Sequence, residues 1–384
     1  MRFPEFSGEW KRVELKDVAE FQKSRIPADS LDASCYISTE NLIPNFGGIK
    51  EASSIPTDGN VMAIKPNDIL ISNIRPYLKK VWQSDRFGGC SADVFVLRTT
   101  RCQSDFLYNI IASDKFINYA MSGAKGVKMP RGDKRQMEEF EFSIPAIEEQ
   151  NRISRLLSLL DERIATQNKI IEKYESLIQA MCDALIESEQ HKVKLSFNDF
   201  GEPYSGLLGK SAEDFGEGCP YITYMNVYQN QIIDTANVGL VKINETEQQS
   251  VVHYGDILFT LSSETAEEVG MGAVYLGDTY PLYLNSFCFG IHIIDENKIF
   301  PPFLAFYVST KSFRKVVFPL AQGSTRFNLQ KNDFMKKVFS FPTVERQRKI
   351  YSALKTYSDK LSVEKSIAKL LCEQKNHLLS QLFI

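Results

Sequence analysis

The sequence predicts an α/β protein with two related globular domains and two long helices that form an antiparallel coiled coil. Three observations lead to this fold class: an internal duplication, a heptad pattern that closes each copy, and short β-rich segments inside each copy. The predicted boundaries are 1–143 for the first domain, 144–190 for the first helix, 191–341 for the second domain and 342–384 for the second helix.

The duplication is seen when 197 is added to a residue number. Matched pairs at this offset include Phe106 with Phe303, Gly126 with Gly323, Lys134 with Lys331, Pro145 with Pro342 and Gln150 with Gln347. Towards the start of each half the offset falls, to 188 for Asp68 and Asp256, 185 for Tyr36 and Tyr221, and 180 for Val13 and Val193. The second half has therefore gained residues in loops, which lets a chain keep its framework and change what it binds.

Each predicted domain combines short strands with helices. In the first domain we predict strands at 61–64, 68–72 and 93–98, between residues that favour turns. Residues 106–121 have helical spacing, with apolar side chains on one face. The second domain repeats this plan.

A heptad pattern predicts a long helix after each domain. The predicted seam consists of Ile153, Leu157, Leu160, Ile164, Ile171 and Ile178 in the first helix, and of Ile350, Leu354, Leu361 and Leu371 in the second. Gln167 and Glu364 are matched polar positions within it. A helix of roughly 35 to 40 residues is about 50–60 Å long, so we interpret each helix as a spacer.

Two alternatives about the helices stay open. The duplicated layout favours pairing within one chain, although a swapped dimer would use the same seam. Leu156, Leu159, Ile170 and Leu177 lie outside the strict heptad positions and predict either a wider bundle core or a surface for a partner protein. The first helix carries more acidic than basic residues, which favours contact with protein over contact with a polyanion.

The composition is ordinary for a soluble protein, with 43% hydrophobic and 24% charged residues. No apolar run approaches the roughly 18 residues of a membrane span, and the first residues lack the apolar core of a signal peptide. The seven cysteines contain no CxxC pair, so we expect reduced thiols in the cytoplasm and no zinc site. A net charge of −3 means that any contact with nucleic acid must come from local basic patches.

Basic residues gather at matched places in the two halves. They are Arg75, Lys79, Lys80, Lys125, Lys128, Arg131, Lys134 and Arg135 in the first half, and Arg314, Lys315, Arg326 and Lys331 in the second. Glycines in the same loops let backbone N–H groups approach a phosphate. Such a run is usually a solvated face, but its repetition beside a spacer predicts a protein that reads two half-sites of one DNA duplex.

These features resemble the specificity (S) subunits of Type I restriction-modification systems, over essentially the whole chain. The resemblance rests on the opening Arg2–Trp10, the segments Lys125–Ile153 and Gln322–Phe334, and the repeated helices. It implies two target recognition domains that each read one half of a bipartite, asymmetric site in double-stranded DNA. It also implies that the paired helices bind the modification (methyltransferase) subunits, with the restriction (endonuclease and translocase) subunits outside them.

The sequence shows no enzyme motif. The nearest match to the base-binding motif of adenine methyltransferases, Asn73–Tyr77, has the wrong length and one proline, and no Walker lysine loop is present. The four histidines are dispersed, without a spacing suited to a metal or a triad. We therefore expect a non-catalytic subunit with no cofactor and no metal. A structural adaptor that binds proteins through both domains, and a diverged DNA methyltransferase or nuclease, are the alternatives.

One loop of the second half, 262–278, has no counterpart of equal length in the first. It carries Glu264, Glu267 and Glu268, whose charge argues against contact with phosphate. A carboxylate can, however, accept a hydrogen bond from cytosine N4, so a contact with a base stays open for this loop.

Overall fold

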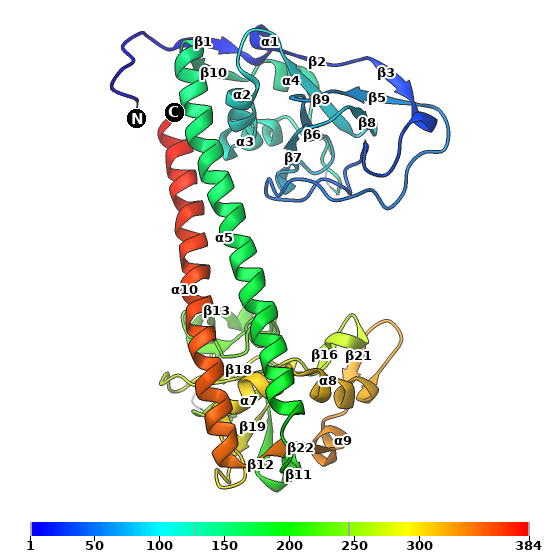
Figure 1. The fold of residues 1–384 in the computed structure, drawn as a ribbon. Helices are drawn as coiled ribbons and strands as arrows, with labels where there is room; N and C mark the ends of the chain where they lie inside the picture. The colour runs from blue at the N-terminus through cyan, green and yellow to red at the C-terminus, as the bar shows by residue number, and fades with distance from the viewer. Residues whose placement is uncertain (1, 127, 245, 383–384) are drawn as a thin grey trace. The chain divides into compact units, whose positions relative to one another are not determined.

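The computed structural model describes residues 2–126, 128–244 and 246–382. It divides into two compact units, one formed by Met1–Asn168 with Ser366–Ile384 and the other by Lys169–Lys365. Each unit holds one globular α/β domain and parts of two long helices, α5 (Ile147–Glu187) and α10 (Val344–Leu382) (Figure 1). The predicted fold class is confirmed.

Short strands and helices build the domain of the first unit. Its strands are β1 (Lys11–Glu14), β2 (Ala19–Phe21), β3 (Arg25–Pro27), β4 (Tyr36–Ile37), β5 (Asn60–Ile64), β6 (Ile69–Ser72), β7 (Val81–Gln83), β8 (Gly88–Cys90), β9 (Val94–Thr99) and β10 (Glu141–Ile144). Its helices are α1 (Leu15–Val18), α2 (Ser104–Ile111), α3 (Asp114–Ser122) and α4 (Lys134–Glu138), with 3-10 turns η1 (Ala28–Ser30) and η2 (Pro76–Leu78). Strands β5, β6 and β9 fall where the sequence predicts them.

The main sheet of the first unit is antiparallel, in the order β2–β9–β6–β7. A second sheet has the order β3–β5–β8–β4, and β1 pairs with β10. Fully buried side chains from the sheet and from α2 and α3, such as Ile69, Phe106 and Phe116, form one core. Ile153 and Leu157 of α5 belong to the same core. The start of the long helix is therefore part of the domain.

The second unit follows the same plan. Its strands are β11 (Lys192–Ser196), β12 (Gly201–Ser205), β13 (Phe215–Ile222), β14 (Gly239–Val241), β15 (Ile257–Thr260), β16 (Ser262–Ser263), β17 (Gly272–Val274), β18 (Tyr283–Leu284), β19 (Cys288–Ile293), β20 (Ala321–Gln322), β21 (Phe327–Leu329) and β22 (Val338–Pro342). Its shorter helices are α6 (Tyr224–Gln229), α7 (Pro301–Tyr307), α8 (Lys311–Val317) and α9 (Lys331–Lys336). The 3-10 turns are η3 (Phe197–Asp199), η4 (Ala212–Asp214), η5 (Ala266–Glu268) and η6 (Phe318–Leu320).

The main sheet of the second unit has the order β12–β19–β15–β17. Its other strands form the sheets β14–β13–β18 and β16–β21–β20 and the pair β11–β22. Its core is rich in aromatic rings. The ring centroid of Phe197 lies 5.0 Å from that of Phe334 and 5.7 Å from that of Phe259. Ile178 and Cys182 of α5 are buried in this core. The end of α5 thus belongs to the second domain, as its start belongs to the first.

Strand pairing confirms the duplication and corrects its register near the start. Antiparallel ladders pair Val13 with Phe142 in the first half and Leu195 with Phe339 in the second. Because Phe142 and Phe339 are equivalent at the offset of 197, Val13 corresponds to Leu195, at an offset of 182. The predicted match of Val13 with Val193 is therefore wrong by two residues. A shift of two keeps every side chain on the same face of a strand, so the apolar pattern could not reveal it.

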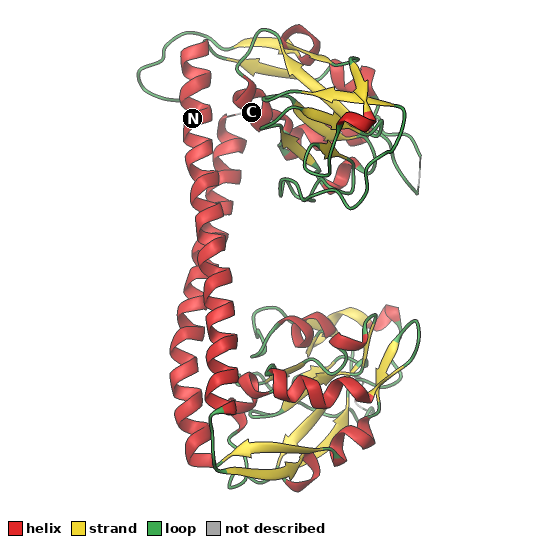
Figure 2. Ribbon diagram, turned by 45° about the vertical axis from the view of Figure 1, so that its right-hand side comes forward, coloured by secondary structure: helices red, strands yellow, loops and turns green. Residues whose placement is uncertain are grey.

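Helices α5 and α10 pair antiparallel in each unit (Figures 1 and 2). Asp161 and Lys375 form an ion pair of 2.6 Å in the first unit, and Glu175 and Lys365 one of 2.7 Å in the second. Of the residues assigned to the seam, Ile164, Ile171 and Leu361 are half-buried and the others are buried. The matched polar residues Gln167 and Glu364 are also buried.

One buried glutamine fastens the start of each long helix to its domain. Gln150 Nε2 donates to the Pro145 carbonyl (2.9 Å), and its Oε1 accepts from the N–H of Gln103 at the start of α2 (2.9 Å). The equivalent Gln347 makes both bonds again. Its Nε2 donates to the Pro342 carbonyl (2.8 Å), and its Oε1 accepts from the N–H of Phe300 at the start of α7 (2.8 Å).

The single helix predicted over 106–121 is two helices, α2 and α3. Ser113 begins the second one, because its hydroxyl oxygen accepts a hydrogen bond from the N–H of Phe116. The apolar spacing continues across the break and hid it. Among the described residues, no helix is both long enough and apolar enough to cross a membrane.

Candidate nucleic-acid interface

A tight hairpin and a neighbouring turn carry most of the predicted basic residues of the first unit. Lys125 and Arg131 face each other across the hairpin, joined by main-chain hydrogen bonds of 2.9 Å in both directions. Arg131 also pairs with Ile74, and the N–H of Arg75 donates to the Pro130 carbonyl (2.8 Å). The fold therefore brings Arg75 beside the loop that carries Lys125 and Arg131.

Arg75 and Lys79 flank the short turn η2 in an unusual backbone conformation. Their φ angles are +51° and +54°, in the left-handed region. This conformation costs a residue with a side chain roughly 1–2 kcal/mol. Strain of this kind is found most often at functional sites. Arg75 is exposed, and the turn displays it to solvent.

Several cations of the first unit have acidic partners close to the surface. The pairs are Lys79 with Asp114 (2.6 Å), Lys125 with Asp133 (2.7 Å) and Arg131 with Asp93 (3.4 Å). Partly exposed pairs contribute about 0–1 kcal/mol, so a phosphate can replace the carboxylate. Lys128 and Arg135 are exposed and have no ion-pair partner within the described ranges.

Lys80 and Lys134 are held more closely by the protein. Lys80 Nζ donates to the Thr39 carbonyl (2.6 Å), and burial, together with the charges of Lys50 and Arg75, lowers its pKa. Lys134 Nζ lies 4.7 Å from the centre of the Phe21 ring. Burial is also the main cause that lowers the pKa of Lys134.

The second unit has an equivalent hairpin, formed by β20 and β21. Gln322 and Asn328 pair across it, and Asn328 pairs with Ser262 of β16. Gly323 has a φ of +145°, and a Cβ there would lie 2.0 Å from the Arg326 carbonyl oxygen, so this turn requires glycine. The hairpin thus reproduces the pairing of Lys125, Arg131 and Ile74 in the first unit.

The predicted cations of the second unit lie in different environments. Lys315 is exposed on α8, and exposed Arg326 places its guanidinium carbon 5.8 Å from the centre of the Phe287 ring. Lys331 Nζ lies 3.4 Å from the Ser205 hydroxyl. Arg314 is different, because its guanidinium donates to the carbonyls of Glu267 (2.6 Å), Val269 (2.7 Å) and Gly270 (2.7 Å). Arg314 therefore fastens the acidic loop to α8.

Buried side-chain oxygens without a hydrogen-bond partner occur at both hairpins. Within the part of the chain that the structure describes, these atoms are Asn73 Oδ1, Gln136 Oε1 and Ser262 Oγ. Asn73 precedes Ile74, and Ser262 takes the place of Ile74 in the second unit. An unpaired buried oxygen costs about 1–3 kcal/mol, so a water or ligand group is expected there.

Sequence reasoning missed a groove of about 250 Å³ in the first unit. Phe21 and Phe95 line it together with Lys23, Arg25 and Lys134. Cations beside aromatic rings suit nucleic-acid binding, since bases stack on rings and phosphates pair with cations. The clue in the sequence was the alternate spacing of Phe21, Lys23 and Arg25, which run from the end of β2 to the start of β3.

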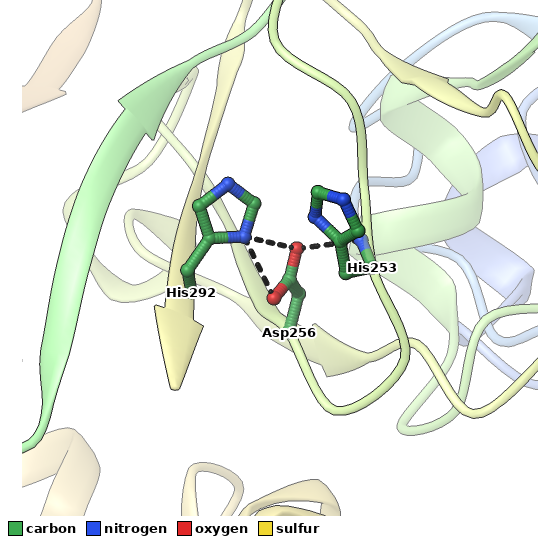
Figure 3. A group of neighbouring side chains, drawn as sticks. All are labelled: His253, Asp256 and His292. Carbon is green, nitrogen blue, oxygen red and sulfur yellow. Dashed lines mark hydrogen bonds and ion pairs between the residues drawn. The ribbon is translucent and has the colours of Figure 1, made fainter. Parts of the chain in front are cut away.

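The fold also brings together two of the histidines that looked dispersed. His253 and His292 lie on either side of the Asp256 carboxylate, and their ligand atoms are within 4.8 Å of one another (Figure 3). The expectation that no histidines cluster is wrong, because β15 and β19 are neighbours in the main sheet although they are distant in sequence.

Comparison with protein families gives a match over most of the chain. Residues 7–176 and 205–371 match the sequence model described as "Type I restriction modification DNA specificity domain". One relative is the MjaVIII specificity subunit of a Type I restriction enzyme from Methanocaldococcus jannaschii. It is 23% identical over 390 aligned positions, which cover 95% of this chain and 89% of the relative. The EcoDI specificity subunit from Escherichia coli is 24% identical over 191 positions, 46% of this chain and 41% of that subunit.

Solved structures share the fold. The S subunit of a Type I restriction-modification system from M. genitalium has a TM-score of 0.56 at 17% identity, with 98% of this chain and 96% of that chain covered. A chain from a study of assembly and conformational transition of the type I system has a TM-score of 0.54 at 18% identity, with 97% of both chains covered.

Proposed function

The chain belongs to the family of Type I restriction-modification DNA specificity proteins, and from that premise we propose that it is the non-catalytic specificity subunit of such a system. Each unit reads one half of a bipartite, asymmetric site in double-stranded DNA. Helices α5 and α10 dock the methyltransferase subunits, and the restriction subunits join outside them. The complex acts in the cytoplasm, and the reading of DNA by this chain requires no cofactor.

The observation that carries this proposal is the repetition of one hairpin in two units, each with exposed basic side chains on it or beside it. Lys125 and Arg131 face each other in the first unit as Gln322 and Asn328 do in the second. Each hairpin is joined to the end of a strand of the main sheet through the same bridge. Two copies of one surface element on two compact units suit a site with two separate halves.

In the first unit we assign phosphate contacts to Lys79, Lys125, Lys128, Arg131 and Arg135. Of their acidic partners, Asp114 is exposed and Asp93 and Asp133 are half-buried, and Lys128 and Arg135 face solvent, so binding DNA requires little desolvation of these basic side chains. Positioning on the duplex is the role such contacts have, because phosphates carry no sequence information.

Arg75 is the best candidate for base reading in the first unit. Its exposed side chain projects from a strained turn that fixes its backbone. A guanidinium can donate two hydrogen bonds to O6 and N7 of guanine, which discriminates by about 1–3 kcal/mol. Lys134, at the rim of the aromatic groove, is assigned a supporting contact, and Lys80 a structural role.

In the second unit we assign DNA contacts to Lys315, Arg326 and Lys331. Arg314 is left out of this set, because its guanidinium is occupied by three carbonyl groups. Its role is to hold the loop around η5, where Glu264 and Glu267 are exposed. This loop lies next to the hairpin, since Ser263 pairs with Phe327. A braced carboxylate there can read a cytosine amino group.

Apolar side chains on the outer surfaces of the helices support the docking role. Leu159 and Leu177 of α5 are each 44% exposed, and Val363 and Leu370 of α10 are 51% and 63% exposed. Leu159 and Leu177 are 18 residues apart, which is five helical turns, so they lie on one face of α5. Exposed Leu159 and Leu177 therefore support the partner-docking alternative, whereas Leu156 and Ile170 are half-buried, as a wider bundle core would have them.

The proposal is tested by expressing the chain with its genomic neighbours in a host that lacks the system, and sequencing the host DNA for methylated bases. We expect a split, asymmetric methylated motif that depends on this chain. The matched control is the same cassette with a stop codon early in this gene. A methyltransferase that copurifies with the chain without any new methylated motif would contradict the DNA-reading role and favour the adaptor.

A further inference from the structure

The duplication places one buried aspartate at the same point in both units. Asp68 and Asp256 each precede a central strand, and both are about 1–2% exposed. Each closes a turn in the same way, since Asp68 Oδ2 accepts from the N–H of Lys65 (2.8 Å) and Asp256 Oδ2 from that of His253 (2.8 Å). The aspartate therefore belongs to the shared framework.

The partners of this aspartate differ between the units. In the first unit, Arg98 of β9 donates to both oxygens of Asp68 at 2.7 Å and to the side-chain oxygen of Gln22 at 2.7 Å. His292 of β19 is equivalent to Arg98. Glu20 pairs with Arg98 in the first unit, and Glu202, which corresponds to Glu20 at the offset of 182, pairs with His292 in the second.

Two separate framework positions have thus become histidine around one carboxylate. His292 Nδ1 lies 3.0 Å from Asp256 Oδ1 and 2.9 Å from Oδ2, and His253 is the first residue of the turn that Asp256 closes (Figure 3). The ring centroids of the two histidines are 4.8 Å apart. In the first unit a single side chain, Arg98, holds both oxygens of the aspartate, so the second imidazole of the second unit calls for another explanation.

We propose that His253, Asp256 and His292 form a binding site for one divalent transition-metal ion of the zinc class. In a tetrahedral zinc site with bonds of about 2.0–2.1 Å, neighbouring ligand atoms are about 3.3 Å apart. The separation of His292 Nδ1 from the Asp256 carboxylate is close to this value. The ion replaces the proton at Nδ1, and rotation of the exposed His253 side chain completes three protein ligands, with a solvent molecule as the fourth.

The surroundings of the carboxylate suit a metal ligand. Tyr204, which takes the place of Gln22, donates its hydroxyl to Asp256 Oδ2 (2.8 Å). Its ring also stacks on that of His292, with centroids 4.1 Å apart and an angle of 21° between the planes. Oδ2 is therefore oriented by Tyr204 and by the turn, whereas Oδ1 has only His292 beside it among the described residues. Hydrogen bonds from such neighbours orient ligands and strengthen metal binding.

The first unit serves as an internal negative control. Arg98 is a permanent cation with no lone pair to offer, and the position of His253 is held by Lys65. Replacing His292 by arginine should therefore keep the framework interaction and remove the metal ligand. This substitution separates metal binding from folding.

The test uses the untagged full-length chain, dialysed against Zn²⁺ or Co²⁺. We expect one ion per chain, with the intense visible absorption of tetrahedral Co²⁺. His292→Arg and His253→Gln should lose binding while the circular dichroism spectrum stays unchanged, and Tyr204→Phe should weaken binding about 10-fold. His191→Gln and His377→Gln, at exposed histidines elsewhere, should bind like the unmodified chain.

Two results would overturn the site. One is a chain that takes up no ion at micromolar concentrations, and the other is binding that persists in both His253→Gln and His292→Arg. Because His253 is exposed, its substitution leaves the domain folded and keeps the test decisive if His292→Arg disturbs folding. Neither result bears on the recognition of DNA, which is measured separately by methylation.

Discussion

Gln150 and Gln347 occupy equivalent positions in the two halves and make the same pair of hydrogen bonds, but the equivalent Asp68 and Asp256 have different partners. The glutamines join each long helix to its domain. The aspartates lie inside the domains, where one faces Arg98 and the other His292. The contacts between helix and domain are thus retained, whereas the partners within the domain are free to change.

The loops of the two halves also differ, although the framework around them is shared. The residue of the first half that is equivalent to Arg314 is Ile117. Its side chain is 3% exposed and packed in the core. Arg314 instead holds the acidic loop of the second half, which has no counterpart of equal length in the first half. The two halves therefore present related hairpins beside unrelated loops, which agrees with the proposal that the two domains read different half-sites.

The largest difference is expected at the buried aspartates. Asp68→Ala removes the carboxylate partner of Arg98, whose charge then has only the neutral Gln22 side chain beside it, and should destabilise the first unit by about 3–5 kcal/mol. Asp256→Ala should cost about 1–3 kcal/mol, because an imidazole can become neutral. Hydrogen exchange resolved by segment measures each unit separately, and Asp85→Ala, at an exposed carboxylate, is the control. Equal losses in both units would show that the change of partner has no energetic consequence.

At the helix junctions the two halves should respond alike. Gln150→Ala and Gln347→Ala each leave a buried N–H and a buried carbonyl without a partner, which should cost about 2–3 kcal/mol. Exchange should rise in α2 for the first variant and in α7 for the second. Gln374→Ala, on the exposed face of α10, is the matched control. A loss confined to one half would contradict the idea of a shared framework.

At the base-reading position, Arg75→Ala should relax the preference for one base pair by about 1–3 kcal/mol and leave the other half-site unchanged. Lys79→Ala, at the other end of the same turn, is the control and should weaken binding to all sequences alike. The measurement is competition binding of the assembled complex to a library of variant sites. If both variants weakened binding to all sequences equally, Arg75 would contact a phosphate and not a base.

The smallest effects are expected for single phosphate contacts. Lys128→Ala and Arg135→Ala in the first unit, and Arg326→Ala in the second, should each lower the slope of log K against log salt by about 0.9. Lys349→Ala, on α10, should not change it. Salt titration of DNA binding by the assembled complex gives these slopes. If only the variants of one unit change the slope, the hairpins are not equivalent in function.

The fold was predictable from the sequence because its main signals are periodic. The seam from Ile153 to Leu371 and the matched pair Gln150 and Gln347 fixed the architecture without knowledge of any contact. Errors arose where periodicity carries no information. The cap at Ser113 divided a helix without interrupting its apolar face, and the shift that pairs Val13 with Leu195 kept the alternation of the strand.

The sequence predicted where the basic residues gather, but not the role of each residue in the candidate site. By charge alone, Arg314 and Arg326 were both predicted to contact DNA. The fold shows that the Arg314 guanidinium is bound to carbonyl groups, whereas Arg326 is exposed to solvent. His253 and His292 are brought together because β15 and β19 are neighbours in the main sheet. The sequence alone does not show which strands pair. The duplication is a further signal for this site, because it aligns Arg98 with His292 once the strand pairing is known.

The central claim is that each unit reads its own half of the DNA site, and an exchange of one domain tests it most directly. Residues 1–143 would be replaced by the corresponding domain of a relative with a known motif, and the methylated motif would be sequenced in cells that express the chimera with the methyltransferase partner. The account predicts a motif in which one half changes to that of the relative and the other half stays the same. A motif that changes in both halves, or in neither, would contradict it.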